Sequence, residues 1–250
     1  MSASQREGTT GEVERRDGRI HSSPPPATEF PYRKPLLGLK GDTMTRYFSR
    51  LALLFLLTML TGANPVWAHH LMGGTTPATF LEGLLSGLGH PIIGLDHFAF
   101  LIALGVAVGI GGLNLLMPAL FVGMSAIGVA LHLNGITVPA AEFLVASSLF
   151  VVGVMIAREA RQTLSVWAGL FALAGLLHGY TYGESIFGAE SSPLWAYLIG
   201  LAVIQTFLAI AIAVVVRTRT AFAASLTPRL TGATIAGIGL AVMTGQLLSA

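Results

Sequence analysis

The sequence predicts an all-α protein, a polytopic integral membrane helix bundle with about six transmembrane helices after a cleavable signal peptide. Composition is the first observation, since 53% of the 250 residues are hydrophobic and only 10% are charged, whereas soluble domains are about 25% charged. Charge placement is the second, because from His69 onward the chain has five Arg, no Lys and six acidic residues. The third is a succession of apolar segments, and the remaining length suffices for about six spans of about 20 residues each.

The first 43 residues differ in character from the rest of the chain. They are polar and rich in Arg, Glu, Ser and Pro, with the run Ser22-Ser23-Pro24-Pro25-Pro26 as an example. A segment of this composition has too little apolar surface to bury a core. We therefore expect residues 1–43 to be disordered, or to be a mis-assigned extension that precedes a true start at Met44.

Residues 44–68 have the pattern of a secretory signal peptide. Arg46 and Arg50 form a basic region, residues 51–60 form a short apolar region, and Ala68 supplies a small residue for cleavage. This order of regions is typical of segments that are removed from the mature protein. The alternative is a genuine polar tail followed by an uncleaved membrane anchor.

The predicted transmembrane domain covers residues 69–250. It opens with an amphipathic stretch at 79–89, and Gly is frequent throughout, as expected where helices pack closely in lipid. No strong internal repeat is visible in the sequence. The six apolar segments expected to cross the membrane are residues 92–112, 113–132, 141–157, 163–178, 194–216 and 231–248.

The arginines predict an orientation for these segments. A cleaved signal peptide places the mature N-terminus in the periplasm of a bacterial cell, and the segments then alternate across the inner membrane. Every Arg after residue 68 falls on a loop that this topology places in the cytoplasm, as the positive-inside rule requires. These residues are Arg158, Arg161, Arg217, Arg219 and Arg229. Two independent observations thus predict a multi-pass inner-membrane protein with a periplasmic N-terminus.

The most informative motif is His-Pro-Ile-Ile-Gly-Leu-Asp-His at residues 90–97. Ionisable groups at membrane depth are costly and usually functional, and imidazole with carboxylate suits a divalent transition metal. On a continuous helix His90 and His97 share a face but lie about two turns apart, too far to hold one ion. Pro91 and Gly94 are residues that can break a helix, although Pro91 also suits the first position of a helix. The alternative is that Asp96 and His97 only cap or cross-link helices.

A second group of polar residues falls on the same predicted periplasmic half. His178 and Glu184 flank a Gly-containing segment that allows the backbone to turn, and we expect them to meet the first motif across the bundle. His132 ends the second span, where a histidine is also a common helix cap. Glu142 fits equally well as a first-turn acid favoured by the helix dipole. The predicted metal ligands are His90, Asp96, His97, His178, Glu184 and His132.

The motif His-Pro-x-x-Gly-x-Asp-His resembles the signature of the HupE/UreJ family of membrane proteins. The signal peptide, the approximately six spans and the His178-Gly179…Gly183-Glu184 segment extend the resemblance over the mature chain. The resemblance implies a secondary nickel permease, with some members carrying cobalt, that supplies hydrogenase or urease maturation. It also implies that the three ionisable residues of 90–97 are critical, with His178 and Glu184 as further candidates. The family often has a second His where this chain has Tyr180 and Tyr182, so the ligand number can differ.

The sequence therefore predicts a secondary transporter, not an enzyme, that takes up Ni²⁺ or Co²⁺ across the bacterial inner membrane. Capture would occur at the periplasmic mouth through His and Asp, and no tightly bound cofactor is expected. Because no G-x-x-x-x-G-K-[ST] motif occurs, the chain itself is not expected to hydrolyse ATP. The expected partners are the metal ion and the lipid bilayer, without nucleic acid. A homo-oligomer and an indirect link to hydrogenase, urease or cobalamin pathways stay open.

Three other functions use the same residues. An intramembrane metalloenzyme would need a general base beside the metal, although no His-Glu-x-x-His motif occurs. A membrane haem-binding electron carrier would need paired axial His that face each other across helices. A passive channel for a neutral solute would not need the ionisable groups at its mouth.

Overall fold

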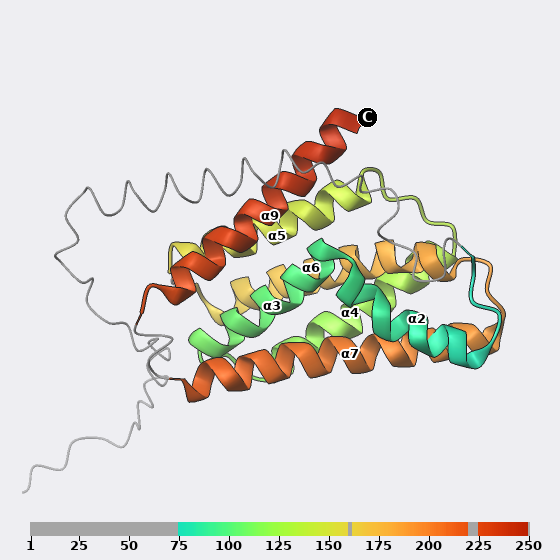
Figure 1. The fold of residues 1–250 in the computed structure, drawn as a ribbon, viewed down its shortest axis with the longest axis horizontal. Helices are drawn as coiled ribbons and strands as arrows, with labels where there is room; N and C mark the ends of the chain where they lie inside the picture. Colours follow the sequence, from blue (N-terminus) through green and yellow to red (C-terminus); the bar gives the residue numbers. More distant parts are fainter. Residues whose placement is uncertain (1–74, 160–161, 220–224, 250) are drawn as a thin grey trace, which may run out of the picture. The chain divides into compact units, whose positions relative to one another are not determined.

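The computed structural model describes residues 75–159, 162–219 and 225–249. In these ranges it contains helices and no strand, so the all-α fold class is confirmed (Figure 1). The predicted extension at 1–43 and signal peptide at 44–68 lie outside the described residues. The elements are α2 (Phe80–Ile93), α3 (Leu95–Ile110), α4 (Leu116–Leu133), α5 (Ala141–Ala157), α6 (Leu164–Tyr182), the 3₁₀ helix η2 (Gly183–Ile186), α7 (Ser191–Thr218) and α9 (Thr227–Ser249).

Each of the six predicted apolar segments coincides with a helix. Four helices in the described ranges are long and apolar enough to cross a membrane, namely α4, α6 with η2, α7 and α9. The bent pair α2–α3 makes a fifth candidate span, while α5 is apolar but only 17 residues long. The structure thus supports a multi-spanning bundle with four or five candidate spans, and the count of six stays a prediction.

The first span is broken. Instead of one helix over 92–112, the chain forms α2 and α3, which meet at Gly94 at an angle of 76°. Pro91 lies in the last turn of α2, and Gly94 adopts an extended backbone with φ −67° and ψ 109°. The amphipathic stretch 79–89 is therefore a helix in its own right. Thr79 and Glu82 start it with a reciprocal capping box, which assigns Glu82 a structural role.

Both halves of the broken span pack on α7, with α2 against the first half of α7 and α3 against its second half (Figure 1). Glycines allow this close approach, because a Cβ at any of them would overlap an atom of α7. The contacts are Gly83 on Pro193, Gly87 on Tyr197, Gly105 on Ala209 and Gly109 on Ala213. Since Gly94 falls between these contacts, the break lies beside the middle of α7 rather than at its start.

The remaining helices form two further close pairs. Helix α4 runs parallel to α6, with Gly179 of α6 against the backbone of Ser125. Helix α5 runs antiparallel to α9 (Figure 1). The α5–α9 contact is reciprocal, since Gly153 packs on Ala236 and Gly232 packs on Ala157.

These pairings relate helices α3–α4–α5 to helices α6–α7–α9. The contact of α3 with α7 corresponds to that of α6 with α4, and the contact of α3 with α9 corresponds to that of α6 with α5. Consecutive helices alternate in direction, so after three helices the corresponding helix of the second set points the opposite way. The antiparallel contact of α5 with α9 shows this directly. Inverted halves of this kind are common in secondary transporters. The relation is approximate, because α3 packs on α5 while α6 makes no comparable contact with α9.

Several charged residues gather at the end of the bundle where α3, α5 and α7 finish. Arg217 donates hydrogen bonds to the backbone oxygens of Val108 and Leu113, which ties α7 to the end of α3. Arg229 of α9 forms an ion pair with Glu159, with Nε and Oε1 2.7 Å apart. Arg158 is exposed where α5 ends. The described arginines therefore share one end of the bundle, as their predicted common side requires.

Candidate functional site

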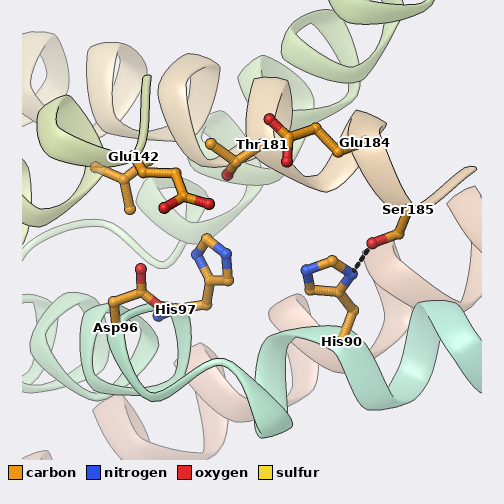
Figure 2. Close-up of a pocket in the computed structure, with 8 residues that line it drawn as sticks. His90, Asp96, His97, Glu142, Thr181, Glu184 and Ser185 are labelled. Carbon is orange, nitrogen blue, oxygen red and sulfur yellow. Dashed lines mark hydrogen bonds between the residues drawn. The ribbon is translucent and has the colours of Figure 1, made fainter. Parts of the chain in front are cut away.

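A small pocket lies where the broken span meets α5, α6 and η2. Its volume is about 20 Å³, which is room for one water molecule or one bare ion. Figure 2 shows its polar side chains, which come from both sides of the break and from the helices that face it. The lining residues are His90, Asp96, His97, Glu142, Val145, Thr181, Glu184 and Ser185.

The break in the first span brings two histidines together. His90 ends α2 and His97 begins α3, and the centroids of their rings lie 5.6 Å apart. On an unbroken helix the seven-residue separation would place them about 10 Å apart along the axis. Both side chains are buried. The bend at Gly94 thus converts a linear motif into one side of a pocket.

His178 joins this pair from α6 and is fully buried. Its Nδ1 lies 3.0 Å from Nδ1 of His97, and its Nε2 lies 3.3 Å from Oγ of Ser148 on α5. A hydrogen bond between two Nδ1 atoms requires one donor and one acceptor. At least one of the two imidazoles is therefore neutral. The predicted meeting of the two motifs across the bundle is present in this contact.

Asp96 stabilises the start of a helix and also lines the pocket, and its predicted role as a metal ligand stays a prediction. Its Oδ1 accepts a hydrogen bond from the backbone N–H of His97 at 2.9 Å, so it stabilises the first turn of α3. The same buried carboxylate lines the pocket. A negative charge at a helix N-terminus interacts favourably with the helix dipole, which stabilises the start of α3.

Two further carboxylates stand at the rim. Glu184 lies on η2 and Glu142 lies in the first turn of α5, and both are exposed. Glu142 accepts a hydrogen bond from Nε2 of Gln246 on α9 at 3.2 Å. In Figure 2 its carboxylate points toward the ring of His97. The pocket therefore has buried histidines at its inner end and exposed acidic side chains at its rim, and Glu142 is one of its lining residues.

His132 lies elsewhere. Its ring contacts the rings of Tyr180 and Phe187, with centroids 4.8 and 5.7 Å away. A Cβ on Gly183 would overlap the His132 side chain, so this histidine packs behind η2. It does not line the described pocket. In this position it supports the element that carries Glu184, and its predicted ligand role stays a prediction.

Hydroxyl groups that the sequence reasoning missed orient His90. Nδ1 of His90 lies 2.9 Å from Oγ of Ser185 and 3.2 Å from the hydroxyl of Tyr197. The Tyr197 hydroxyl donates its proton to the backbone oxygen of Tyr182 at 2.9 Å. In its contact with His90 the Tyr197 oxygen can then act only as an acceptor, and this contact is a hydrogen bond in the tautomer of His90 that has its proton on Nδ1 and its lone pair on Nε2. Buried partners of this kind fix the tautomer of metal-binding histidines.

The side chains are close but are not arranged as a finished coordination sphere. Among the described residues, no three His, Asp or Glu side chains are placed to hold one ion. The hydrogen bond between His97 and His178 occupies one ring nitrogen of each residue. Binding of a cation by both would require this bond to open and the rings to turn toward the pocket.

Comparisons with known proteins identify similar sequences. A family model described as HupE / UreJ protein matches residues 45–242. Protein HupE of Rhizobium leguminosarum bv. viciae is 28% identical over 190 residues, which is 75% of this chain and 96% of that protein. No solved structure matches the chain.

Proteins of this family are membrane permease-like accessory proteins rather than enzymes, and the family is associated with nickel and cobalt uptake. The family match covers most of the chain, including every helix that lines the pocket. The apolar helices and the broken span with its histidine pocket fit such a membrane protein. The chain belongs to the HupE/UreJ family.

Proposed function

We propose that this protein takes up Ni²⁺ or Co²⁺ across the bacterial inner membrane, and that the pocket at the break captures the ion from the periplasmic side. The observation that carries the proposal is the convergence of His90 and His97 on a cavity of ionic size with acidic side chains at its rim, with His178 hydrogen-bonded to His97 next to it. Imidazole and carboxylate are ligands that suit these two ions. The family association with nickel and cobalt uptake supports it.

The charges around the pocket suit a dication. Asp96, Glu142 and Glu184 line it, and the two exposed glutamates can raise the local concentration of cations before they enter. Inside the bundle a dication needs ligands or opposite charge to replace its lost hydration, because an uncompensated buried ion is strongly destabilised. Asp96 supplies a negative charge directly beside His97. A neutral solute would need neither the rim nor the histidines, which disfavours the passive channel.

Capture would proceed by exchange of partners. The His97–His178 bond opens, and the freed nitrogens replace water ligands of the arriving ion. Only neutral imidazole binds a metal, so uptake should weaken in acid as the imidazoles take up protons. After capture, a membrane potential of about 100 mV would favour inward movement of a dication by about 4.6 kcal/mol.

The pocket dimensions disfavour the haem alternative. Two axial histidines must stand on opposite faces of a porphyrin, whereas Nδ1 of His97 and Nδ1 of His178 lie only 3.0 Å apart. A volume of about 20 Å³ is also far too small for a macrocycle. A visible absorption spectrum of the purified protein without a Soret band would agree with this conclusion.

Uptake of radiolabelled Ni²⁺ and Co²⁺ tests the proposal. Cells that express the intact chain should accumulate at least one of the ions with saturation at low concentration, and His97→Ala should abolish this uptake. Glu190→Gln is a suitable control, since Glu190 is an exposed acid outside the pocket. Failure of the intact chain to accumulate either ion, when its presence in the membrane is verified, would refute the proposal.

A further inference from the structure

A second polar cluster lies inside the bundle next to the histidines. It consists of Ser125 on α4, Tyr182 at the end of α6 and Gln205 in α7. Their exposed fractions are 1%, 0% and 1%. Gln205 stands near the midpoint of the 28-residue α7. The cluster therefore lies well inside the membrane-spanning part of the fold.

Hydrogen bonding within this cluster is incomplete. Nε2 of Gln205 lies 3.4 Å from Oγ of Ser125, longer than the usual separation of about 2.9–3.0 Å. Within the described ranges, the Tyr182 hydroxyl and Oε1 of Gln205 make no hydrogen bond of regular geometry, and the polar group within reach of the hydroxyl is the Gln205 side chain itself. Buried polar atoms without partners are rare, and each calls for an explanation.

The cluster is continuous with the pocket through one residue. The ring of Tyr182 faces His97, His90 and His178, at centroid distances of 4.5, 5.1 and 6.4 Å. Gly179, the neighbour of His178, packs directly on Ser125. Tyr182 thus separates the histidine pocket from Gln205 by a single side chain.

We propose that Gln205, Ser125 and Tyr182 form a second cation subsite, in which oxygen atoms receive the partly hydrated divalent ion after it leaves the histidines. This inference rests on the proposed function. Imidazoles hold nickel and cobalt firmly, whereas amide and hydroxyl oxygens hold them weakly or through water ligands. A weaker site next to a stronger one provides a route for release, since conduction requires that an ion can leave as well as enter.

Variants at Gln205 separate this role from packing. Gln205→Met keeps the length of the side chain but removes its oxygen, whereas Gln205→Glu keeps an oxygen ligand. We expect Gln205→Met to lower the maximal rate of metal uptake about tenfold, the scale of one lost hydrogen bond to a charged partner. The Gln205→Glu variant should retain more uptake than Gln205→Met. If the cluster only holds helices together, Gln205→Met should transport metal as well as the intact chain does.

Binding measurements on the same variants complete the test. In lipid nanodiscs, Ni²⁺ or Co²⁺ titrated calorimetrically should bind Gln205→Met as tightly as the intact chain, because the histidine pocket is preserved. Wild-type uptake by Gln205→Met, or loss of its binding together with its uptake, would overturn the subsite. Absence of both binding and uptake in the intact chain would instead refute the proposed function, and the subsite with it.

Ser125→Ala provides a second variant in case Gln205→Met does not reach the membrane. Its matched control is Ser147→Ala on α5, where the serine hydroxyl bonds to the backbone oxygen of Phe143 in its own helix at 2.7 Å. Ser125→Ala should lower the maximal uptake rate with binding unchanged, and Ser147→Ala should alter neither. Equal uptake by the two alanine variants would contradict the subsite.

Discussion

At the scale of single residues, the sequence predicts some of the side chains that form the pocket but not others. His90, Asp96 and His97 stand out because ionisable residues are scarce in an apolar chain. Ser185 and Tyr197 do not, since hydroxyl residues are ordinary in such segments and no spacing links them to His90. Their contact with its Nδ1 arises because η2, which carries Ser185, and α7, which carries Tyr197, both lie against the end of α2, and sequence spacing cannot predict this.

Gly94 offers a direct test of the break. A Cβ at this position would lie 2.7 Å from Cδ2 of His97, while its φ of −67° suits any residue. Gly94→Ala should therefore displace the imidazole without straining the backbone. We expect metal affinity to fall about tenfold to a hundredfold, as when a supporting contact of a ligand is lost. Gly123→Ala, where nothing lies within 4 Å, is the control. Equal metal affinity of the two variants in calorimetry would argue against this role.

The hydroxyl of Tyr197 gives a second prediction at this scale. Tyr197→Phe removes the contact with His90 and leaves the backbone oxygen of Tyr182 without this donor. We expect the variant to lose about 1–3 kcal/mol of stability, the scale for a buried group left unsatisfied, and to bind metal more weakly. Thermal unfolding in detergent and metal titration measure the two effects. Unchanged metal affinity would show that Tyr197 does not orient His90.

At the scale of elements, hydropathy predicted where helices occur but not how the first span is built. The six apolar segments all coincide with helices, because burial in lipid requires apolar residues and internally bonded backbone. Pro91 and Gly94 permit a break without specifying its angle. The bend of 76° is stabilised by α2 packing on α7, which is a tertiary contact. The packing of α2 on α7 also explains why α2 extends to Ile93, beyond the amphipathic stretch at 79–89 that the sequence predicts.

Close helix pairing makes a prediction about α4 and α6. A Cβ on Gly179 would overlap the backbone of Ser125, whereas Gly169 on the same helix has open space around it. Gly179→Ala must push the two helices apart, and overpacking of this kind costs about 1–3 kcal/mol. Gly169→Ala should leave stability unchanged or slightly higher. Thermal unfolding of both variants in detergent checks the difference, and equal melting temperatures would contradict the predicted packing.

At the scale of the whole molecule, the reciprocal contacts relate two sets of three helices that the sequence did not reveal as a repeat. The two sets share the spacing of their small residues rather than an overall sequence similarity. Gly105 and Gly109 of α3 correspond to Gly175 and Gly179 of α6, each pair four residues apart. Gly153-x-x-x-Ala157 likewise corresponds to Gly232-x-x-x-Ala236. Pairs of small residues four positions apart are difficult to recognise as a repeat in a chain with many glycines. The connections between the helices also differ in length, which makes the repeat harder to detect.

The orientation inferred from arginines is testable because the chain has no cysteine. Thr137 is exposed in the loop at the pocket end, and Thr218 is exposed at the end where the arginines gather. Thr137→Cys should react with a membrane-impermeant maleimide in intact spheroplasts. Thr218→Cys should react only after the membrane is opened. The reverse pattern would place the pocket on the cytoplasmic side and contradict periplasmic capture.

Titration of Co²⁺ into the purified chain in nanodiscs, followed by visible and X-ray absorption, tests the central claim most directly. The account predicts one ion per chain with imidazole nitrogen among its ligands. This signal should be lost in His97→Ala and retained in His132→Phe, because His132 packs behind η2. Absence of a bound ion, or a signal that depends on His132 but not on His97, would show that the pocket at the break does not capture the metal.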